Sequence, residues 1–321
     1  MLKLIRRYYF LFSLLFVTLL TLVDGWGITT GVGLWLKNHH GPDLVIVLIF
    51  FLSGLALDTS TIRTGLSDIR GTVTALLLIF IVAPLLTLPF SLFQPEPGIL
   101  IGLFLVAVMP TTLSSGVVMT GASGGNMAHA LLITILANSL AVLTIPFTLG
   151  LLLSLAGESR AIAIDKLPII IKIATLVLLP LGTGIIMRRR LRSALEPFLP
   201  FTIICSQIGI LTMVWMALCR GRETVLANLD AIFPVLSMIF LYHLALILMG
   251  LLLTRVLGIE KGHRESVIFM GGQKTLPLSI ILQVSLFPEF GLALVVCVLH
   301  HVIHLIMDGF LVEYLKKKNE Q

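Results

Sequence analysis

The sequence predicts an all-α integral membrane protein with ten transmembrane helices, arranged as two inverted repeats of five helices. Three observations support this prediction: the composition, the number of long apolar segments, and two polar interruptions at matching places in the two halves. The chain has 321 residues, of which 57% are hydrophobic and only 12% charged, and its mean hydropathy is +1.07. Soluble domains carry about 25% charged residues, so the composition favours a membrane protein.

The charge and the cysteines exclude other classes. The net charge of +6 comes from basic residues that are spread between apolar segments and form no stripe, so no nucleic-acid partner is expected. Cys205, Cys219 and Cys297 lie in or beside apolar segments and have neither a disulfide framework nor metal-ligand spacing. No HExxH, GxGD or GxSxG motif occurs, so no protease or lipase is predicted.

The first apolar run, from Tyr8 to Val23, follows Lys3, Arg6 and Arg7 in the order typical of a signal peptide. It leads into Asp24-Gly25-Trp26, without a small-x-small cleavage site. We therefore expect an uncleaved first span.

A spanning helix needs about 20 mainly apolar residues, because each backbone polar group must be satisfied within the segment. Ten segments meet this requirement once two long apolar runs are divided at their breaks, and this division leaves nine or eleven spans as alternatives. The predicted spans are 8–23, 42–58, 70–93, 97–122, 125–154, 167–187, 198–219, 230–257, 264–286 and 289–313.

The distribution of lysine and arginine predicts the orientation. If the N-terminus is cytoplasmic, fifteen of these residues fall in cytoplasmic segments and five in external segments. We therefore expect a multi-pass protein of the cell membrane with both termini in the cytoplasm. The lack of a long extramembrane domain and of a transit-type N-terminus favours a bacterial inner membrane.

The two halves of the single membrane domain, 1–157 and 158–321, align with a shift of about 163 residues, and such inverted repeats are typical of secondary transporters. This shift places the polar break at Pro110 opposite Gln273, and Gly125 opposite Pro288. With five spans in each half, the second half begins from the opposite side of the membrane.

The predicted spans four and nine are both interrupted, by VAVMPTTLSSGVVMTGASGGN (106–126) and VIFMGGQKTLPLS (267–279). Proline removes a helical hydrogen bond, and the neighbouring side chains offer polar groups at the break. Paired interruptions of this kind indicate a solute or ion site near the membrane midplane. The candidate residues are Pro110, Thr111, Thr112, Ser114, Ser115, Gln273, Lys274 and Thr275.

Lys274 gives the strongest indication of function. An ionisable group at a helix centre costs about 2.5–3.5 kcal/mol on insertion scales, and such groups usually mark a pathway or a pair. Lys274 lies too far from either end of span nine for its side chain to reach the membrane interface. The alternative is that the breaks are structural only, since proline and glycine are common in membrane helices.

Span five adds Asn126, Thr134 and Asn138, of which the last two are spaced i,i+4 and could face the fourth-span break. Packing within the helix bundle is the alternative. In span ten, His300 and His304 have a spacing that zinc can use. No cysteine or carboxylate is expected to complete that set, so no metal is predicted.

We expect interhelical hydrogen bonds for these histidines, and also for His129 and His243. Asp308 is expected at the membrane interface, beside the lysines that follow span ten.

Three ordered segments resemble the SBF-like branch of the bile acid:sodium symporter superfamily: FFLSGLALDTSTIRTGL (50–66), MPTTLSS…GGN (109–126) and GGQKTLPLS (271–279). The resemblance implies a panel domain of spans one, two, six and seven, and a core domain of spans three to five and eight to ten. It also implies that the broken spans four and nine cross near the substrate and ion sites.

Two departures from that family concern sodium. Its sodium-coupled members typically carry a glutamate shortly before the glutamine of span nine and an asparagine in span four. Here Gln273 follows Phe269-Met270-Gly271-Gly272, and span four offers no asparagine before Asn126. Thr134 does fall where the family places an ion-binding hydroxyl.

We therefore expect a secondary transporter of an organic solute, an anion by resemblance, in which Lys274 replaces a bound sodium ion. No cofactor is expected. Sodium and protons both stay open as coupling ions, with the missing ligands counting against sodium and Lys274 able to carry a proton. The alternative is a non-transporting membrane regulator or sensor with the same fold. The oligomeric state is not predicted.

Overall fold

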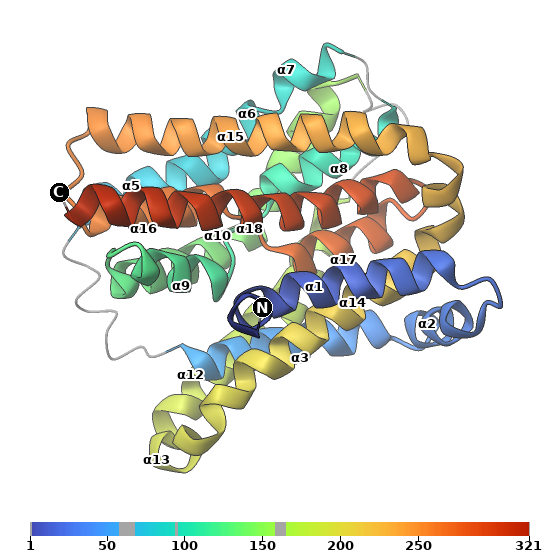
Figure 1. Ribbon diagram of the computed structural model, residues 1–321, viewed down its shortest axis with the longest axis horizontal. Helices are drawn as coiled ribbons and strands as arrows, with labels where there is room; N and C mark the ends of the chain where they lie inside the picture. The colour runs from blue at the N-terminus through green and yellow to red at the C-terminus, as the bar shows by residue number, and fades with distance from the viewer. Residues whose placement is uncertain (1, 58–67, 94–95, 158–164, 321) are drawn as a thin grey trace.

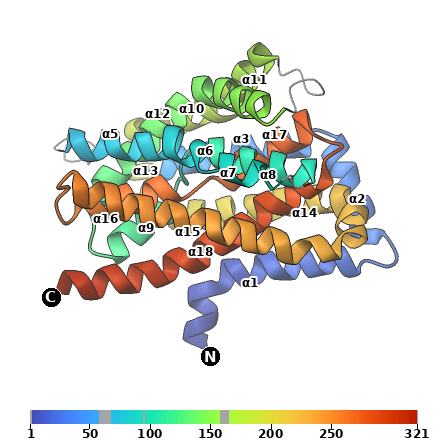
Figure 2. The same cartoon turned by 90° about the horizontal axis from the view of Figure 1, so that it is seen from above.

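A computed structural model describes residues 2–57, 68–93, 96–157 and 165–320 of the chain. Within these residues every regular element is a helix, and most helices run along the longest axis of the molecule (Figure 1). The view from above shows that they lie in several layers (Figure 2). The start of the predicted second half, at residue 158, and residues 58–66 of the first family motif lie outside the described residues.

Seven described helices are long and apolar enough to cross a membrane, or eight if the bent pair Phe12–Val23 and Ile28–Asn38 counts as one span. Two further apolar helices, Gly41–Ala56 and Pro97–Val108, are shorter. The chain is therefore an all-helical, multi-pass membrane protein. The seven are Ile69–Ser91, Met127–Leu155, Lys166–Arg190, Glu196–Ala227, Leu229–Val256, His263–Leu286 and Gly291–Asn319.

The N-terminal part contains a helix that the sequence analysis did not predict. α1 (Leu2–Val23) is followed by α2 (Ile28–Asn38), which is bent by 107° from it. Asp24 Oδ2 fixes the bend by accepting hydrogen bonds from Thr30 N at 2.7 Å and from Thr29 Oγ1 at 2.8 Å. These bonds, the Thr30 amide first, lower the pKa of Asp24 to about 2.

The rest of the first half follows the predicted segments, with two irregularities. A π-helical turn interrupts the third, and six residues without helix interrupt the fourth. The elements are α3 (Gly41–Ala56), α5 (Ile69–Leu77), η2 (Leu78–Val82), α6 (Ala83–Leu85), α7 (Leu88–Ser91), α8 (Pro97–Val108), α9 (Ser115–Ala122) and α10 (Met127–Leu155).

The second half contains a comparable break between α16 and α17, and its own π-helical turn, η4, in the sixth predicted span. Its last helix extends seven residues beyond the predicted end at 313. The elements are α11 (Lys166–Ile173), η4 (Ala174–Leu178), α12 (Leu179–Arg190), α13 (Arg192–Leu195), η5 (Glu196–Phe198), α14 (Leu199–Ala227), η6 (Leu229–Ala231), α15 (Ile232–Val256), α16 (His263–Gly272), α17 (Leu276–Leu286) and α18 (Gly291–Glu320).

Two sets of helices pack mainly among themselves. In one set α3 packs against α12 and α14, and α1 packs against α14. In the other, α18 packs against α8 and α15, and α16 packs against α5, α9 and α15. The interrupted segment α16–α17 is the most enclosed of the seven long apolar segments, since 94% of an 18-residue stretch of it is buried. The second interruption therefore lies in the middle of the molecule.

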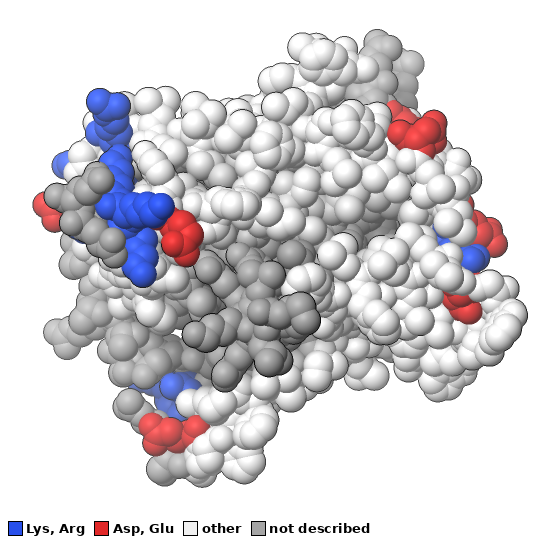
Figure 3. Space-filling model, in the orientation of Figure 1, with Lys and Arg blue, Asp and Glu red and all other residues white. Residues whose placement is uncertain are grey.

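On the face shown in Figure 3, the described residues form a broad uncharged band between two charged ends. Lysine and arginine gather over the end where α18 finishes, which we call the basic end. Such a band suits contact with lipid. The residues that define the basic end are Arg188, Arg189, Arg190, Arg255, Lys261, Arg264, Lys316, Lys317 and Lys318.

Candidate functional site

The two interruptions lie against each other. α8 ends at Val108 and α9 starts at Ser115, while α16 ends at Gly272 and α17 starts at Leu276. The backbone N–H of Thr275 donates a hydrogen bond to the carbonyl of Pro110, at 3.0 Å. Both breaks thus contribute to one buried site, although they are about 165 residues apart in the chain.

Lys274 is 2% exposed, and its ammonium group contacts three backbone carbonyls. Its Nζ lies 3.0 Å from the carbonyl oxygens of Ile79, Ala107 and Met109. An ammonium has three N–H donors and no acceptor, so all its hydrogen bonds are made. The carbonyls come from the third and fourth predicted spans, and the lysine joins both to the ninth.

These carbonyls are available because of two prolines and a helix end. In the π-helical turn, the N–H of Ala83 bonds to Leu78 O, so the next bond would run from residue 84 to Ile79 O. Residue 84 is proline and has no N–H. Ala107 and Met109 stand at the end of α8, where the last carbonyls lack helical donors, and Pro110 follows.

Gln273 ties the same breaks together through its side chain. Its Oε1 accepts hydrogen bonds from Thr112 Oγ1 at 2.7 Å and from Ser115 Oγ at 2.8 Å. Thr112 Oγ1 in turn accepts from Ser115 Oγ and from the backbone N–H of Gly116. The structure thus brings together Thr112, Ser115 and Gln273, as expected for a single site.

The amide nitrogen of Gln273 contacts a residue that the sequence analysis placed elsewhere. Gln273 Nε2 donates to Asp308 Oδ2 at 2.8 Å, and also lies 3.0 Å from Met119 Sδ. The prediction that Asp308 lies at the membrane interface is wrong, because it is 2% exposed. It is buried because α18 continues for twelve residues beyond it, to Glu320.

Thr111, Thr134 and Asn138 form a second polar group beside the fourth-span break. Asn138 Nδ2 donates to Thr134 O at 2.9 Å and reaches Thr111 O at 3.5 Å. Thr134 Oγ1 bonds to Ala130 O within its own helix. Thr111 Oγ1 and Asn138 Oδ1 are buried without a hydrogen-bond partner among the described residues. Two buried oxygens beside the break are therefore left without a hydrogen-bond partner among the described residues.

Two candidate residues lie apart from this group. Asn126 caps α10, since its Oδ1 accepts from the backbone N–H groups of Ala128 and His129. Its Nδ2 contacts His263 Nε2 at 3.2 Å, near the basic end. Ser114 stands at the start of α9, and its side chain makes no capping bond there.

A comparison with known protein families matches residues 8–317 to one family. The chain belongs to the SBF-like CPA transporter family. The match confirms the resemblance found in the sequence. The family is one of transporters and not of enzymes.

Several relatives of this SBF-like chain have names that state a transport activity. It is 29% identical over 283 residues to a probable sodium/metabolite cotransporter BASS4, chloroplastic, of Arabidopsis thaliana, covering 82% of this chain and 63% of that one. It is 24% identical to putative symporter YfeH of Escherichia coli, covering 86% and 84% of the two chains. It is 25% identical to sodium/bile acid cotransporter 7 of Xenopus tropicalis, covering 85% and 81%.

Of the histidines in this SBF-like chain, His129 and His243 make the interhelical hydrogen bonds that the sequence predicted, whereas His301 and His304 bond to each other within α18 and His300 Nε2 has no hydrogen-bond partner among the described residues. His129 bonds to Thr72 Oγ1 of α5 and Ser266 Oγ of α16. His243 Nε2 of α15 bonds to Asp308 Oδ1 of α18 at 3.0 Å. Among the described residues, no three His, Cys, Asp or Glu side chains form a group that could hold a metal ion.

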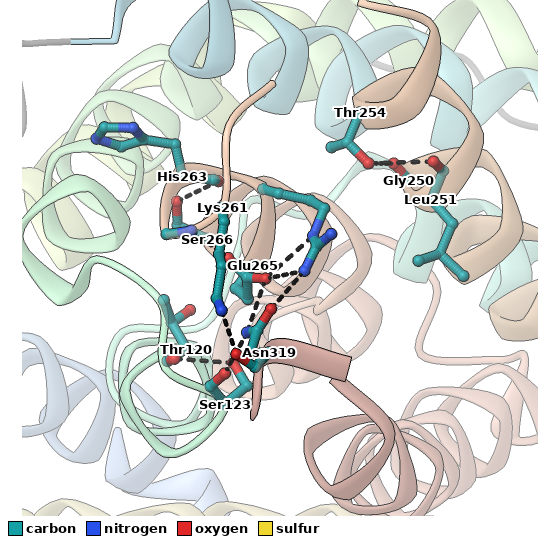
Figure 4. Close-up of polar contacts among 12 residues, drawn as sticks. Thr120, Ser123, Gly250, Leu251, Thr254, Lys261, His263, Glu265, Ser266 and Asn319 are labelled. Carbon is teal, nitrogen blue, oxygen red and sulfur yellow. Dashed lines mark hydrogen bonds and ion pairs between the residues drawn. The ribbon is translucent and has the colours of Figure 1, made fainter. Parts of the chain in front are cut away.

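The basic end is held by a second buried carboxylate (Figure 4). Glu265 of α16 is fully buried and accepts hydrogen bonds from the Gly262 backbone, from Arg264, and from Asn319 Nδ2 at 3.1 Å. Asn319 Nδ2 also donates to Ser123 O at 2.9 Å. This cluster fastens the ends of α9 and α18 to the start of α16.

A surface pocket lies at the opposite end, where α14 meets α17 and α18. It is lined by Lys37 of α2, Arg220 and Thr224 of α14, and Gln283 of α17, among others. Two basic side chains at its rim would attract anions. This pocket could not be predicted from the sequence, because its residues are far apart in the chain.

Proposed function

We propose that this protein is a secondary transporter of an organic anion that works by alternating access around the two meeting breaks. The observation that carries the proposal is the buried ammonium of Lys274, bonded to carbonyls of two other spans at the point where both interrupted helices meet. Intramembrane charged residues usually mark a transport pathway. The family match and the names of the relatives support the transport class.

We further propose ten membrane crossings in two inverted repeats of five. Under this proposal α3 and α8 cross as well, although each is shorter than the other spans. The helices around α3, α12 and α14 would form a panel, and those around α8, α16 and α18 a core. The contact between Pro110 and Thr275 supports the repeat, since the two breaks occupy matching places in the halves.

Lys274 takes the place of a bound sodium ion in this proposal. Carbonyl oxygens that converge on one point repel one another unless a cation lies between them. Here the ammonium supplies that charge on a covalent tether, so no dissociable ion is needed at this place. The relatives from Arabidopsis and Xenopus are named as sodium cotransporters. This chain would differ from them by holding its cation permanently.

Anion preference is supported by the positions of the cations. Lys37 and Arg220 line the pocket between α14 and the core helices. At the central site, Thr111 Oγ1 and Asn138 Oδ1 are unpaired among the described residues and stand beside the break. A carboxylate-bearing solute would meet basic groups on entry and then the Thr111 hydroxyl, which can donate a hydrogen bond, while Asn138 Oδ1 could accept one from a donor group of the solute.

We also propose that the basic end faces the cytoplasm and that the membrane is a bacterial inner membrane. Cytoplasmic segments of membrane proteins are enriched in Lys and Arg. Relatives occur in Escherichia coli and Pseudomonas aeruginosa, which supports the bacterial assignment.

The experiment is a screen of organic carboxylates and sulfonates for thermal stabilisation of the purified protein, followed by counterflow in proteoliposomes. A bound solute stabilises the folded state by mass action. We expect at least one anion to stabilise the wild type and to exchange across the membrane. Stabilisation without exchange would instead support a sensor, and no effect of any anion would contradict an anion site.

Lys274→Gln should abolish both responses, because a neutral side chain cannot balance the carbonyls. Lys172→Gln is the matched control: Lys172 also lies in an apolar helix, but it is 32% exposed and bonds to Ser285 Oγ. Counterflow by Lys274→Gln at the wild-type rate would refute the role of Lys274.

A further inference from the structure

One carboxylate and four imidazoles form a buried cluster beside Gln273. The amide nitrogen of Gln273 faces this cluster, whereas its amide oxygen bonds to Thr112 and Ser115. The cluster joins α15, which carries one member, to α18, which carries four. Nothing in the cycle proposed above uses it. Its members are His243, His300, His301, His304 and Asp308, each at most 6% exposed.

Asp308 has no cationic partner among the described lysines and arginines. Its Oδ1 lies 3.0 Å from His243 Nε2, and its Oδ2 lies 2.8 Å from Gln273 Nε2 and 3.8 Å from His304 Nδ1. A buried charge is costly unless it is paired. Imidazoles can supply that pairing only by taking up a proton, so the cluster has a physical reason to bind one.

Three ring nitrogens in the cluster are unpaired among the described residues: His243 Nδ1, His300 Nε2 and His304 Nδ1. Buried polar atoms are almost always hydrogen-bonded, so three unpaired nitrogens in one place need an explanation. The rings of His243, His300 and His304 are neighbours, with centroids 5.3 to 5.7 Å apart. Basic nitrogens at this spacing offer alternative places for one proton.

We propose that Asp308, His243 and His304 bind one exchangeable proton, and that this proton is the coupling ion of the transporter. A proton from water adds to a lone pair of the carboxylate or of an imidazole, and no other bond breaks. The net charge of the cluster rises from −1 to zero. Release reverses the step. Proton binding stands on the geometry alone, whereas coupling rests on the proposed transport function.

Gln273 supplies the link from the proton to the two breaks. In the described arrangement, the Asp308 carboxylate accepts from Gln273 Nε2. A proton on Oδ2 places an O–H where the amide N–H donates, so this oxygen becomes a weaker acceptor for Gln273 Nε2. In the proposed step Gln273 then reorients, and this loosens its bonds with Thr112 and Ser115 in the fourth-span break.

The surroundings contain few other charges. From α17 and its preceding break, Lys274 acts on His300 electrostatically but holds its own three carbonyls. From α9 the neighbour is Met119, and from α1 it is Phe10, beside His301. His301 contacts His304 Nε2 through its Nδ1, at 2.9 Å. A change in protonation therefore acts on the cluster itself, on Tyr242, whose ring lies against His300, and on the backbone of Lys274, which His301 contacts.

Infrared difference spectroscopy of the purified full chain in nanodiscs, as the pH is changed, tests proton binding without any solute. We expect the wild type to show either the C=O band of a neutral carboxylic acid or imidazolium ring bands that appear as the pH falls. Asp308→Asn should lose the carboxylic band and reduce the imidazole change. If Asp308→Asn gives the wild-type difference spectrum, or the wild type shows neither change, the proton site is refuted.

Matched controls separate this result from misfolding. Asp43→Asn alters an acid on α3 whose side chain is 37% exposed, and it should leave the spectrum of the buried cluster intact. His243→Gln keeps a hydrogen-bonding amide beside Asp308, and it should alter the imidazole bands without loss of monodispersity. Each variant is compared only after its helical content matches the wild type.

The coupling part is tested in proteoliposomes with an anion found in the stabilisation screen. An imposed proton gradient should drive uptake by the wild type, whereas Asp308→Asn should exchange solute at a rate independent of the gradient. Uptake by Asp308→Asn that still follows the gradient would refute coupling at this site. If no anion is transported at all, the infrared result still decides whether the proton binds, so the two proposals fail separately.

Discussion

At the residue scale, Lys274 supplies hydrogen-bond donors to backbone carbonyls that lack helical partners near two prolines. Pro84 removes the backbone donor for Ile79 O, and the break at Pro110 leaves Ala107 O and Met109 O without helical donors, so the ammonium group bonds to all three instead. A lysine in an apolar segment is costly on its own, but an unpaired carbonyl in lipid is costly too. The lysine and the prolines therefore stabilise the same arrangement.

Replacing Lys274 by methionine should destabilise the protein, because methionine keeps the size of the side chain but removes every donor. Three buried carbonyls would lose their partner, and at ~1 kcal/mol each we expect a loss of about 3 kcal/mol in the free energy of unfolding. Denaturant unfolding in detergent, followed by circular dichroism, measures this loss. Lys172→Met should cost much less, and an equal cost for both variants would contradict the role given to the carbonyls.

Asp308 is a residue of the site that was not predicted from the sequence. The matched breaks predicted Gln273, Lys274, Thr112 and Ser115, because proline, glycine and polar residues stand out in an apolar segment. Asp308 stands near the predicted end of a span, where charged residues are ordinary. Its i,i+4 spacing from His304 was the available signal, and recognising it would have required the true length of α18.

At the element scale, α3 and α12 meet through a pair of glycines. A Cβ added at Gly54 would lie 2.3 Å from Leu181 O, and one added at Gly184 would lie 2.3 Å from Phe51 O. Side chains cannot approach backbone oxygens so closely, so the glycines set the distance between the two helices.

Gly54→Ala and Gly184→Ala should therefore each push α3 and α12 apart. We expect a loss of about 1–3 kcal/mol in unfolding free energy, as for other overpacked interiors. Gly182→Ala is the control, because it lies on the same helix and its added Cβ would meet nothing within 4 Å. Equal thermal unfolding of Gly182→Ala and Gly184→Ala would contradict this description of the contact.

The end of α18 should depend on Asn319. Asn319→Ala removes the bonds to Ser123 O and to Glu265, and leaves the Glu265 carboxylate with fewer donors. We expect faster hydrogen exchange in the last turns of α18 and in the end of α9, with the central breaks unchanged. Lys318→Ala, one residue away and exposed, is the control; the same acceleration there would count against a specific fastening by Asn319.

Some elements could not be predicted from the sequence, for physical reasons. The helix α2 was not predicted because Gly31, Gly33 and two threonines interrupt its apolar pattern, and because its start depends on the turn that Asp24 stabilises. Long uniform segments such as α10 and α15 were predicted within a few residues, because their hydropathy is continuous. Asn126 was assigned to the central site, but a helix cap and a ligand oxygen cannot be told apart by residue type.

At the scale of the whole molecule, the uncharged band and the basic end predict one orientation in the membrane. A cysteine at the exposed position 317 should react with an impermeant maleimide only after cells are permeabilised. A cysteine replacing Trp26, in the turn between α1 and α2, should react in intact cells. Both variants require Cys205→Ser, because Cys205 is exposed. The reverse pattern of labelling would invert the proposed topology.

The central claim is that Lys274 serves as a tethered cation in place of sodium. The most direct measurement is the melting temperature of the purified wild type in sodium chloride and in choline chloride at equal ionic strength. A bound ion stabilises a protein according to its concentration. We predict the same melting temperature in both salts, because the carbonyls are already occupied by the ammonium group. A wild-type melting temperature that rises with the sodium concentration would contradict the claim.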